Sequence, residues 1–277
     1  MLSLKKTPWL VLFFTLLICP SVEAQTTEQQ TEPAFTPRER LVFTLKWENV
    51  PAGTGILEVM PDTEIKGAPA LHFRGRAWTN SFADVFYKVR DQIDGYAAPD
   101  LSKSLYYTQR QRENDYNRDI EVTFDWKRMR AHHLSSGEHK ESVALLPGAL
   151  DQLSVYYYMR SLDIRLNRDV LAVVTDGEKC VIGRAEIVRF EWVDVPAGRF
   201  WTFLVEPEIK HLGGVFRKSP DAKIQVWITA DHRHIPVKGR SKVSVGHFNF
   251  VLEEILTDPT RELAVDVPPE LMDKVND

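Results

Sequence analysis

The chain has 277 residues, of which 35 are basic and 39 acidic, so its formal net charge is −4. This balance supplies no basic surface for a polyanion, and nucleic acid is therefore not an expected partner. Hydrophobic residues make up 43% of the chain, which is enough for one large domain or two small ones.

The first 24 residues have the pattern of a secretory signal peptide. Lys5 and Lys6 precede an apolar run from Trp9 to Cys19, and small residues around Ala24 supply a cleavage pattern. The apolar run is 11 residues long, whereas a spanning helix needs about 20. We therefore expect cleavage after Ala24 and a periplasmic mature chain that is not transmembrane.

Residues 25–37 are polar and without periodicity, which predicts a flexible lead-in. Residues 38–277 are predicted to form a single β-rich domain, whose first half covers about 38–146. Short segments of alternating apolar residues, bounded by turn formers, predict antiparallel strands in this half. They lie at 41–47, 54–60, 70–79, 85–93, 104–112, 119–126 and 129–135. Asp94-Gly95 is predicted as the turn that ends the strand at 85–93.

One helix is predicted at about 149–161, because apolar residues recur there near the helical period: Leu150, Leu153, Tyr157 and Leu162. This stripe needs an apolar partner, and the inner face of the sheet is the surface large enough to receive it. Complete cover would plug that face, whereas partial cover would leave a hydrophobic cleft. We expect the partly open arrangement.

Strands resume in a second half at about 165–256, and the proline-containing tail at 257–277 predicts an irregular strap. The heptapeptide WENVPAG at Trp47–Gly53 recurs as WVDVPAG at Trp192–Gly198. Each copy contains turn formers after a Trp-ending strand, so each predicts a hairpin. The repeat predicts two related halves joined by the helix. The expected fold is mainly β, a large curved antiparallel sheet or half-open β-barrel or β-spiral with internal duplication and one central helix.

Three segments carry a resemblance to a known family. ERLVFTLKW with its VPAG turn, DQLSVYYYMR, and VWITADHRHIPVK resemble, in this order, a widespread family of secreted bacterial proteins classed as a domain of unknown function. That family implies no activity. The Trp-ending strand, turn and Pro-bearing return strand at 226–238 are also similar to the half-open β-barrel carriers of lipoprotein localisation, a resemblance that implies a fold holding acyl chains.

No motif of established catalytic chemistry occurs in the chain, including the nucleophile elbow, the zinc-protease helix and the phosphate-binding loop. We therefore expect a non-enzyme with no catalytic residue, no metal and no cofactor, although carboxylate pairs stay possible because their spacing is spatial. Cys180, the only thiol after the leader, is expected to be a packed residue. His232 and His234 would share a face on a strand, but we interpret this segment as a turn rather than a metal site.

Charged residues of both signs alternate at 110–130. Arg110 with Arg112, and Arg128 with Arg130, could form basic stripes for lipid phosphates or cell-wall carboxylates. Acidic residues are interleaved with them, so we predict a solvated, charge-mixed outer face. His132 and His133 are interpreted as surface residues.

Aromatic residues on the predicted strands exceed what one short helix can cover, and they are candidates to line a hydrophobic cleft. The cleft candidates are Trp47, Trp78, Phe86, Trp192, Trp201 and Trp227. They favour a non-catalytic envelope protein that binds a lipid or lipoprotein acyl chain in its concave β face. The alternative is a scaffold that supports the cell envelope through contacts with the cell wall or an envelope protein.

Overall fold

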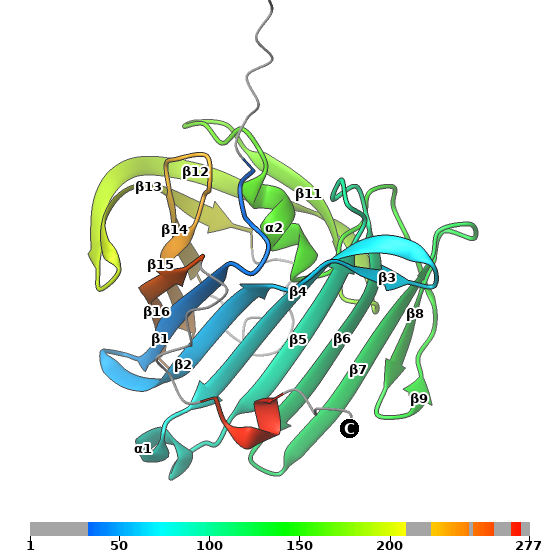
Figure 1. The fold of residues 1–277 in the computed structure, drawn as a ribbon, viewed down its shortest axis with the longest axis horizontal. Coiled ribbons are helices and arrows are strands. Elements are labelled where there is room, and N and C mark those ends of the chain that lie inside the picture. Colours follow the sequence, from blue (N-terminus) through cyan, green and yellow to red (C-terminus); the bar gives the residue numbers. More distant parts are fainter. Residues whose placement is uncertain (1–32, 209–222, 244–245, 258–266, 273–277) are drawn as a thin grey trace, which may run out of the picture. The chain divides into compact units, whose positions relative to one another are not determined.

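The fold is built on one antiparallel sheet, seen in the computed structural model of the chain (Figure 1). The structure describes residues 33–208, 223–243, 246–257 and 267–272. Ten strands precede the second helix: β1 Arg40–Trp47, β2 Val50–Val59, β3 Thr63–Ile65, β4 Ala68–Thr79, β5 Arg90–Ala97, β6 Ser104–Glu113, β7 Tyr116–Asp125, β8 Arg130–Ser135, β9 Glu138–His139 and β10 Val143–Ala144. Six follow it: β11 Val170–Thr175, β12 Cys180–Val195, β13 Gly198–Pro207, β14 Lys223–Thr229, β15 Pro236–Val243 and β16 Gly246–Leu256.

The strand order confirms the predicted meander. It runs β10-β8-β7-β6-β5-β4-β2-β1-β16-β15-β14-β13-β12-β11, while β3 pairs with β4 and β9 with β8. The first and last strands, β1 and β16, pair along their whole length and join the two halves at the middle of the sheet. The path ends at β10 on one side and β11 on the other, so within the described residues the sheet is not closed into a barrel.

Two short α-helices interrupt the strands. The helix α1, Ser81–Asp84, connects β4 to β5, and α2, Ser154–Arg160, lies between the β4–β5 part and the β11–β13 part of the sheet (Figure 1). A 3-10 helix at Pro269–Leu271 packs near β2 and β4. Residues 149–153 are not helical as predicted. Leu150 instead forms a parallel bridge with Val174, and Asp151 accepts hydrogen bonds from the backbone N–H groups of Leu153 and Ser154 at 2.9 and 2.8 Å.

The face of the sheet that receives α2 is called the inner face here. Tyr157 is fully buried on it and stacks on Phe73 of β4 with ring centroids 3.8 Å apart. Phe35 meets both rings edge-on at 5.3 and 5.5 Å, and Leu153 joins the same apolar cluster. Three residues of the predicted stripe, Leu150, Leu153 and Tyr157, are therefore buried against the inner face, whereas Leu162 is only partly buried and packs on a neighbouring cluster. On this half of the sheet the helix fills the expected cleft rather than leaving it partly open.

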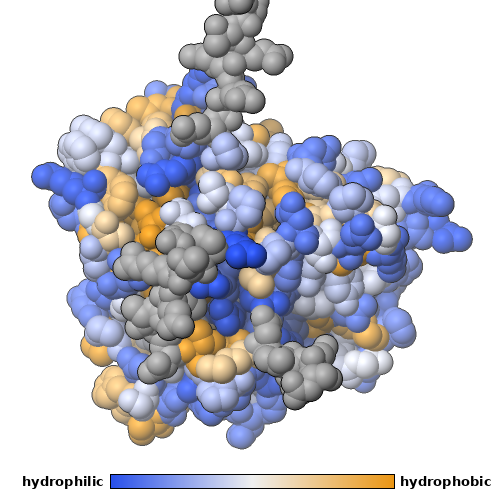
Figure 2. Space-filling model, viewed as in Figure 1, coloured by the Kyte–Doolittle hydropathy of each residue, from blue (hydrophilic) through white to orange (hydrophobic). Residues whose placement is uncertain are grey.

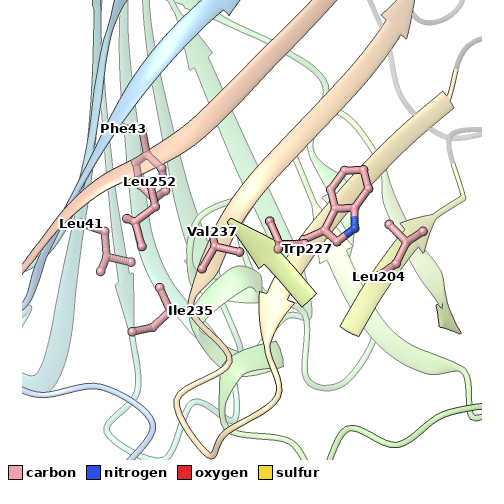
Figure 3. Packing of buried hydrophobic residues seen from close by; sticks show 8 residues of the cluster. Leu41, Phe43, Leu204, Trp227, Ile235, Val237 and Leu252 are labelled. Carbon is pink, nitrogen blue, oxygen red and sulfur yellow. The ribbon is translucent and has the colours of Figure 1, made fainter. Parts of the chain in front are cut away.

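A second apolar cluster fills the inner face of β1 and β16 (Figure 3). Leu41, Phe43 and Leu252 come from the central strands. The same cluster contains Leu204 of β13 and Trp227 of β14, and Val195, Ala197 and Phe200 of the β12–β13 hairpin pack against it. The backbone N–H of Ala197, at the tip of the β12–β13 hairpin, donates to the carbonyl of Leu252 at 3.1 Å. The β12–β13 hairpin thus covers the inner face of the central strands, as α2 covers the inner face of β4 and β5.

A buried ion pair fastens α2 to the start of the domain. Arg160, the last residue of α2, donates to Glu39 at 2.6 and 3.2 Å, and both residues are at most 3% exposed. The same guanidinium donates to the carbonyls of Ala34 and Arg233 at 2.7 and 2.8 Å. His234 contacts the Arg160 carbonyl through Nδ1 at 2.8 Å. Burial alone would lower the pKa of Arg160, but Tyr156 and the Glu39 carboxylate raise it above the ordinary value.

Both copies of the WxxVPAG repeat join antiparallel strands, as predicted. Their turns fall at different places, however. In the first copy β1 ends at Trp47 and the turn is at residues 48–49, so Pro51–Gly53 already belong to β2. In the second copy β12 continues to Val195 and the turn is at residues 196–197. Trp47 therefore stands at a strand end, whereas Trp192 stands inside a strand.

The predicted turn at Asp94-Gly95 is wrong. Both residues lie inside β5, and residues 85–89, predicted as strand, mostly connect α1 to β5. A Cβ atom at Gly95 would come within 2.7 Å of Asp151 Oδ1, so glycine there lets the loop before α2 approach the sheet. In Asp94-Gly95 the glycine therefore marks a close contact between β5 and the loop before α2, and not a turn.

Leu153→Ala is expected to lower the free energy of unfolding by about 2–5 kcal/mol, because Leu153 is 3% exposed and its neighbours would surround a cavity. Urea unfolding followed by tryptophan fluorescence measures the loss. Leu166→Ala, at a side chain that is 43% exposed, is the matched control and should cost much less. Equal losses in the two variants would contradict the buried placement of α2.

Candidate functional site

Two of the six cleft candidates are packing residues on opposite sides of the sheet. Trp78, 7% exposed, lies on the face away from α2 with Ile56, and Leu271 of the 3-10 helix covers it. Trp227, 6% exposed, belongs to the inner cluster, and its indole N–H donates to Glu191 at 2.6 Å. The placement of Trp78 differs from the prediction, since alternation along β4 puts Trp78 and Phe73 on opposite faces.

Trp192 and Trp201 form an exposed aromatic strip with Phe190 on the β12–β13 hairpin. Trp192 and Trp201 are paired across the strands, with ring centroids 4.1 Å apart, and Phe190 stacks on Trp201 at 4.5 Å. The three side chains are 42–46% exposed. The strip lies on the opposite side of the hairpin from Val193, which packs into the inner cluster. These two candidates are brought together, but outside the inner face.

Trp47 and Phe86 lie apart from that strip. Trp47 is 53% exposed at the end of β1, where its cross-strand partner is Phe248. Phe86 is 69% exposed just after α1 and contacts Phe82 edge-on, with ring centroids 5.6 Å apart. Asn80 donates to the carbonyl of Pro51 at 2.9 Å, so α1 is held beside the β1–β2 hairpin. The six candidates therefore do not converge on one cleft.

The fold places three other residues or pairs singled out by the sequence: Cys180, His232 with His234, and His133. Cys180 is half-buried at the start of β12, its Sγ accepts from the backbone N–H of Leu146 at 3.4 Å, and burial raises the pKa of the thiol. His232 and His234 lie in the turn between β14 and β15, not on a strand. His133, predicted as a surface residue, is 2% exposed because its position on β8 faces the interior.

The face of the sheet opposite α2, called the outer face here, carries a charged network over β1–β5. Glu58 of β2 accepts from Arg40 at 3.1 Å and from Arg76 at 2.6 Å. Arg76 also donates to the carbonyl of Leu271 at 3.1 Å, which ties the 3-10 helix to this face. Figure 2 shows mainly hydrophilic residues over β5–β8 in the same view. The outer face is thus polar and charge-mixed, as the sequence predicted.

Asp94 is the centre of a second cluster on this face. Its Oδ1 accepts from His72 Nε2 and Arg74 Nε, each at 2.7 Å, and its Oδ2 accepts from Gln92 Nε2 at 2.7 Å. Burial alone would raise the pKa of Asp94, but the His72 hydrogen bond, the Arg74 charge and the Gln92 amide lower it to about 2. Asp94 is therefore a fixed anion that orders its neighbours.

A pocket of about 400 Å³ lies beside this cluster. It spans β4 to β8, and its lining includes Arg74, Gln92, Asp94, Arg110 and Glu121. A second, smaller pocket of about 200 Å³ lies at the β12–β14 strands, around Arg184, Glu206 and Lys223. None of the six aromatic candidates lines either pocket.

Of the residues that line this pocket, only Arg110 was a binding candidate from the sequence. A signal was present, because Arg74 and Arg76 alternate on one strand while Gln92 and Asp94 alternate on the next. Polar residues of opposite charge at alternate positions of adjacent strands share a face. The predicted turn at Asp94-Gly95 concealed this pairing.

Asp94→Asn is expected to reduce the loss of stability of the fold in acid. Because the folded pKa of about 2 lies below the ordinary value of 3.8, Asp94 stabilises the fold above about pH 4. This contribution, about 2 kcal/mol, is lost as the pH falls from about 4 to about 2.

Urea unfolding at a series of pH values should give a flatter stability curve for Asp94→Asn in that window and a lower stability above it. Asp62→Asn, at an exposed position, is the control that should follow the wild-type curve. A wild-type slope retained in Asp94→Asn would contradict the assignment.

No curated protein sequence matches this chain. A beta-barrel-like protein of domain of unknown function DUF1849 from Brucella abortus is similar in structure, with a TM-score of 0.55, 8% identity, and coverage of 79% of this chain and 97% of that one. Two others have lower TM-scores. They are a Bacteroides fragilis protein with a YmcC-like fold, described as exported (TM-score 0.37, 10% identity, 80% and 96% coverage), and a Parabacteroides distasonis protein described as a lipoprotein (0.34, 11%, 80% and 96%).

Within the described residues, no helix has the length and apolar character needed to cross a bilayer. The Brucella similarity supports the fold alone, a β-barrel-like sheet. The family described as "Protein of unknown function (DUF3108)" matches residues 42–253, which is most of the chain, and this chain therefore belongs to the DUF3108 family.

Proposed function

We propose that this protein is a non-catalytic protein of the bacterial cell envelope that acts in the periplasm through contacts made by its surface. The leader pattern at residues 1–24 supports the location. The filled inner face is the observation that carries the surface role. A carrier would need apolar volume inside the sheet, and that volume is occupied by side chains of the protein itself.

The packing of the inner face supports this choice over the acyl-chain carrier. Tyr157 and Leu153 cover β4 and β5, and the β12–β13 hairpin covers β1 and β16. Burial of an acyl chain contributes about 0.8 kcal/mol for each methylene. To enter here, however, the chain would have to displace packed side chains whose own burial contributes a similar free energy for each methylene. The scaffold alternative requires no such displacement.

Two buried carboxylates, Asp94 and Asp151, fit structural roles better than catalytic ones, whereas burial raises the pKa of Asp91 to about 6. A catalytic acid or base works best when its pKa lies near the operating pH and it can reach substrate. Asp94 is held far below that range by three donors. Asp151 is buried, which raises its pKa, and it accepts from the hydroxyls of Ser104 and Ser154 at 2.5 and 2.6 Å and from the backbone N–H of Ser154, the first residue of α2. Asp94 thus orders side chains on the sheet, and Asp151 orders the backbone at the start of α2.

The proposal is tested with the full chain, expressed with its own leader and purified from the periplasm of a Gram-negative host. The protein is sedimented with purified cell-wall sacculi and, separately, with inner- and outer-membrane vesicles. We expect retention on at least one envelope fraction and no soluble sugar, peptide or fatty-acid product. A chain that stays in every supernatant, or that releases product, would overturn the proposal.

A second candidate is retained because apolar surface is exposed at the rim of the inner face. Trp47, Val50 and Phe248 are 48–53% exposed where β1, β2 and β16 end. An amphiphile could place its apolar part on this rim without displacing α2. This keeps the lipid or lipoprotein ligand as an alternative, with Trp47 as the residue that would contact it.

Trp47→Ala provides the test of this alternative. If the rim binds amphiphiles, a fluorescent fatty acid should bind the wild type, and Trp47→Ala should weaken it several-fold through lost aromatic area. Trp192→Ala, at a comparably exposed Trp outside the inner face, is the control that should bind normally. No fluorescence change with the wild type would remove the candidate.

A further inference from the structure

The outer-face pocket is assembled from two rows of side chains that cross the strands. One row places Gln92 beside Arg110, and Arg110 beside Asp119. The next places Asp94 beside Thr108, Glu121 and then Leu134. Side chains paired in this way lie on the same face and about 5 Å apart. The pocket therefore presents regularly spaced polar groups above a rigid sheet.

The hairpin between β8 and β9 closes one side of the pocket. Ser136 and Gly137 both have positive φ, 49° and 85°, as in the tight turns that suit two-stranded hairpins. Gly137 and Leu134 line the pocket from this hairpin. The volume of about 400 Å³ lies within the range of small-ligand sites, about 300–1,000 Å³.

Gln92 supplies a hydrogen-bond acceptor that lacks a partner. Its side chain is buried at 2% exposure, and its Nε2 donates to the Asp94 carboxylate. Because a carboxylate only accepts, this contact fixes the amide with Oε1 as the remaining acceptor. Among the described residues, Oε1 has no hydrogen-bond partner. A buried acceptor without a donor is costly, and Oε1 itself has almost no exposed surface, so a ligand hydroxyl reaches it only when the pocket lining shifts to admit it.

The charges around the pocket select against a strongly charged ligand. Two arginines, Arg74 and Arg110, face three carboxylates, Asp94, Asp119 and Glu121. One of these, Asp119, is paired with Arg112 at 2.7 Å. The remaining charges balance, so neither an anion nor a cation is favoured overall. Donors and acceptors alternate instead, and a hydroxyl group satisfies both kinds because it donates and accepts.

An aromatic row borders the pocket on the same face. Tyr96 follows Asp94 by two residues on β5, and it stacks on His72 at 4.3 Å and lies 5.7 Å from Tyr106. Burial, together with Glu121, raises the pKa of Tyr106 to about 12. Tyr106 is thus neutral. It lies beside Tyr96 on one side and interacts with Glu121 of the pocket on the other. Apolar ring surface beside hydroxyl-binding groups suits a sugar, whose ring has both C–H and O–H surfaces.

We propose that this pocket binds a neutral, hydroxyl-rich segment of a glycan chain. The inference rests on the proposed envelope role and names its ligand class. Gln92 Oε1 accepts from a sugar hydroxyl, Arg110 and Thr108 donate to others, and Glu121 accepts at the opposite side. Asp94 accepts hydrogen bonds from Gln92 and Arg74 and so holds both side chains in place. It makes no contact with the ligand itself.

The test begins with an array of neutral and acidic oligosaccharides probed with the purified full chain. Isothermal titration then measures affinity for the strongest neutral binder. Arg110→Ala should weaken binding about tenfold or more by removing a charged donor. Leu134→Trp should abolish it by filling the pocket without removing any polar group. Arg165→Ala, at an exposed arginine far along the chain in the loop after α2, should bind like the wild type.

Thermal unfolding of each variant establishes that it is folded before its affinity is interpreted. The inference is overturned if no neutral oligosaccharide binds, if only acidic ones bind, or if both pocket variants bind as the wild type does. Sacculus or vesicle binding that survives in Leu134→Trp would leave the envelope role standing and reject the pocket. If the wild type binds an oligosaccharide, Leu134→Trp does not, and the wild type is retained on no envelope fraction, the pocket stands and the envelope role is rejected.

Discussion

The buried pair between Arg160 and Glu39 is the constraint on which the arrangement of the fold depends. One guanidinium holds three places together: the segment before β1, the end of α2, and the turn between β14 and β15. Removing one partner of such a pair leaves an uncompensated charge inside the protein, which costs several kcal/mol. The pair thus fixes where α2 lies, and α2 in turn fills the inner face.

A sheet with one face filled and the other charged presents its polar groups on the outside. Alternation along each strand separates the two sets, because Phe73 and Ile93 point to the inner clusters while Arg74 and Asp94 point outward. The inner set supplies the apolar burial that stabilises the fold. The outer set contributes ordered ion pairs, such as those of Asp94, which make a polar surface that is rigid as well as charged.

Rigidity matters for the proposed role because a surface that binds a polar ligand must not spend its affinity on ordering side chains. The Asp94 cluster and the Glu58 cluster are preorganised by short hydrogen bonds. The aromatic strip at Phe190, Trp192 and Trp201 is likewise stacked before any partner arrives. These surfaces suit a protein whose work is attachment within the envelope, with more than one contact available at once.

The fold class, most strands and both repeat hairpins could be predicted from residue patterns alone, since period-2 alternation and turn formers act locally on the backbone. The same patterns indicated the buried residues Leu150, Leu153 and Tyr157 at and before α2. The face that each aromatic side chain occupies could not be predicted in this way, because burial of Trp78 or exposure of Trp192 depends on elements distant in sequence. The same holds for the turn misassigned at Asp94-Gly95 and for the pocket around Gln92. Their chemistry arises from cross-strand registers and long-range packing, which a single strand does not encode.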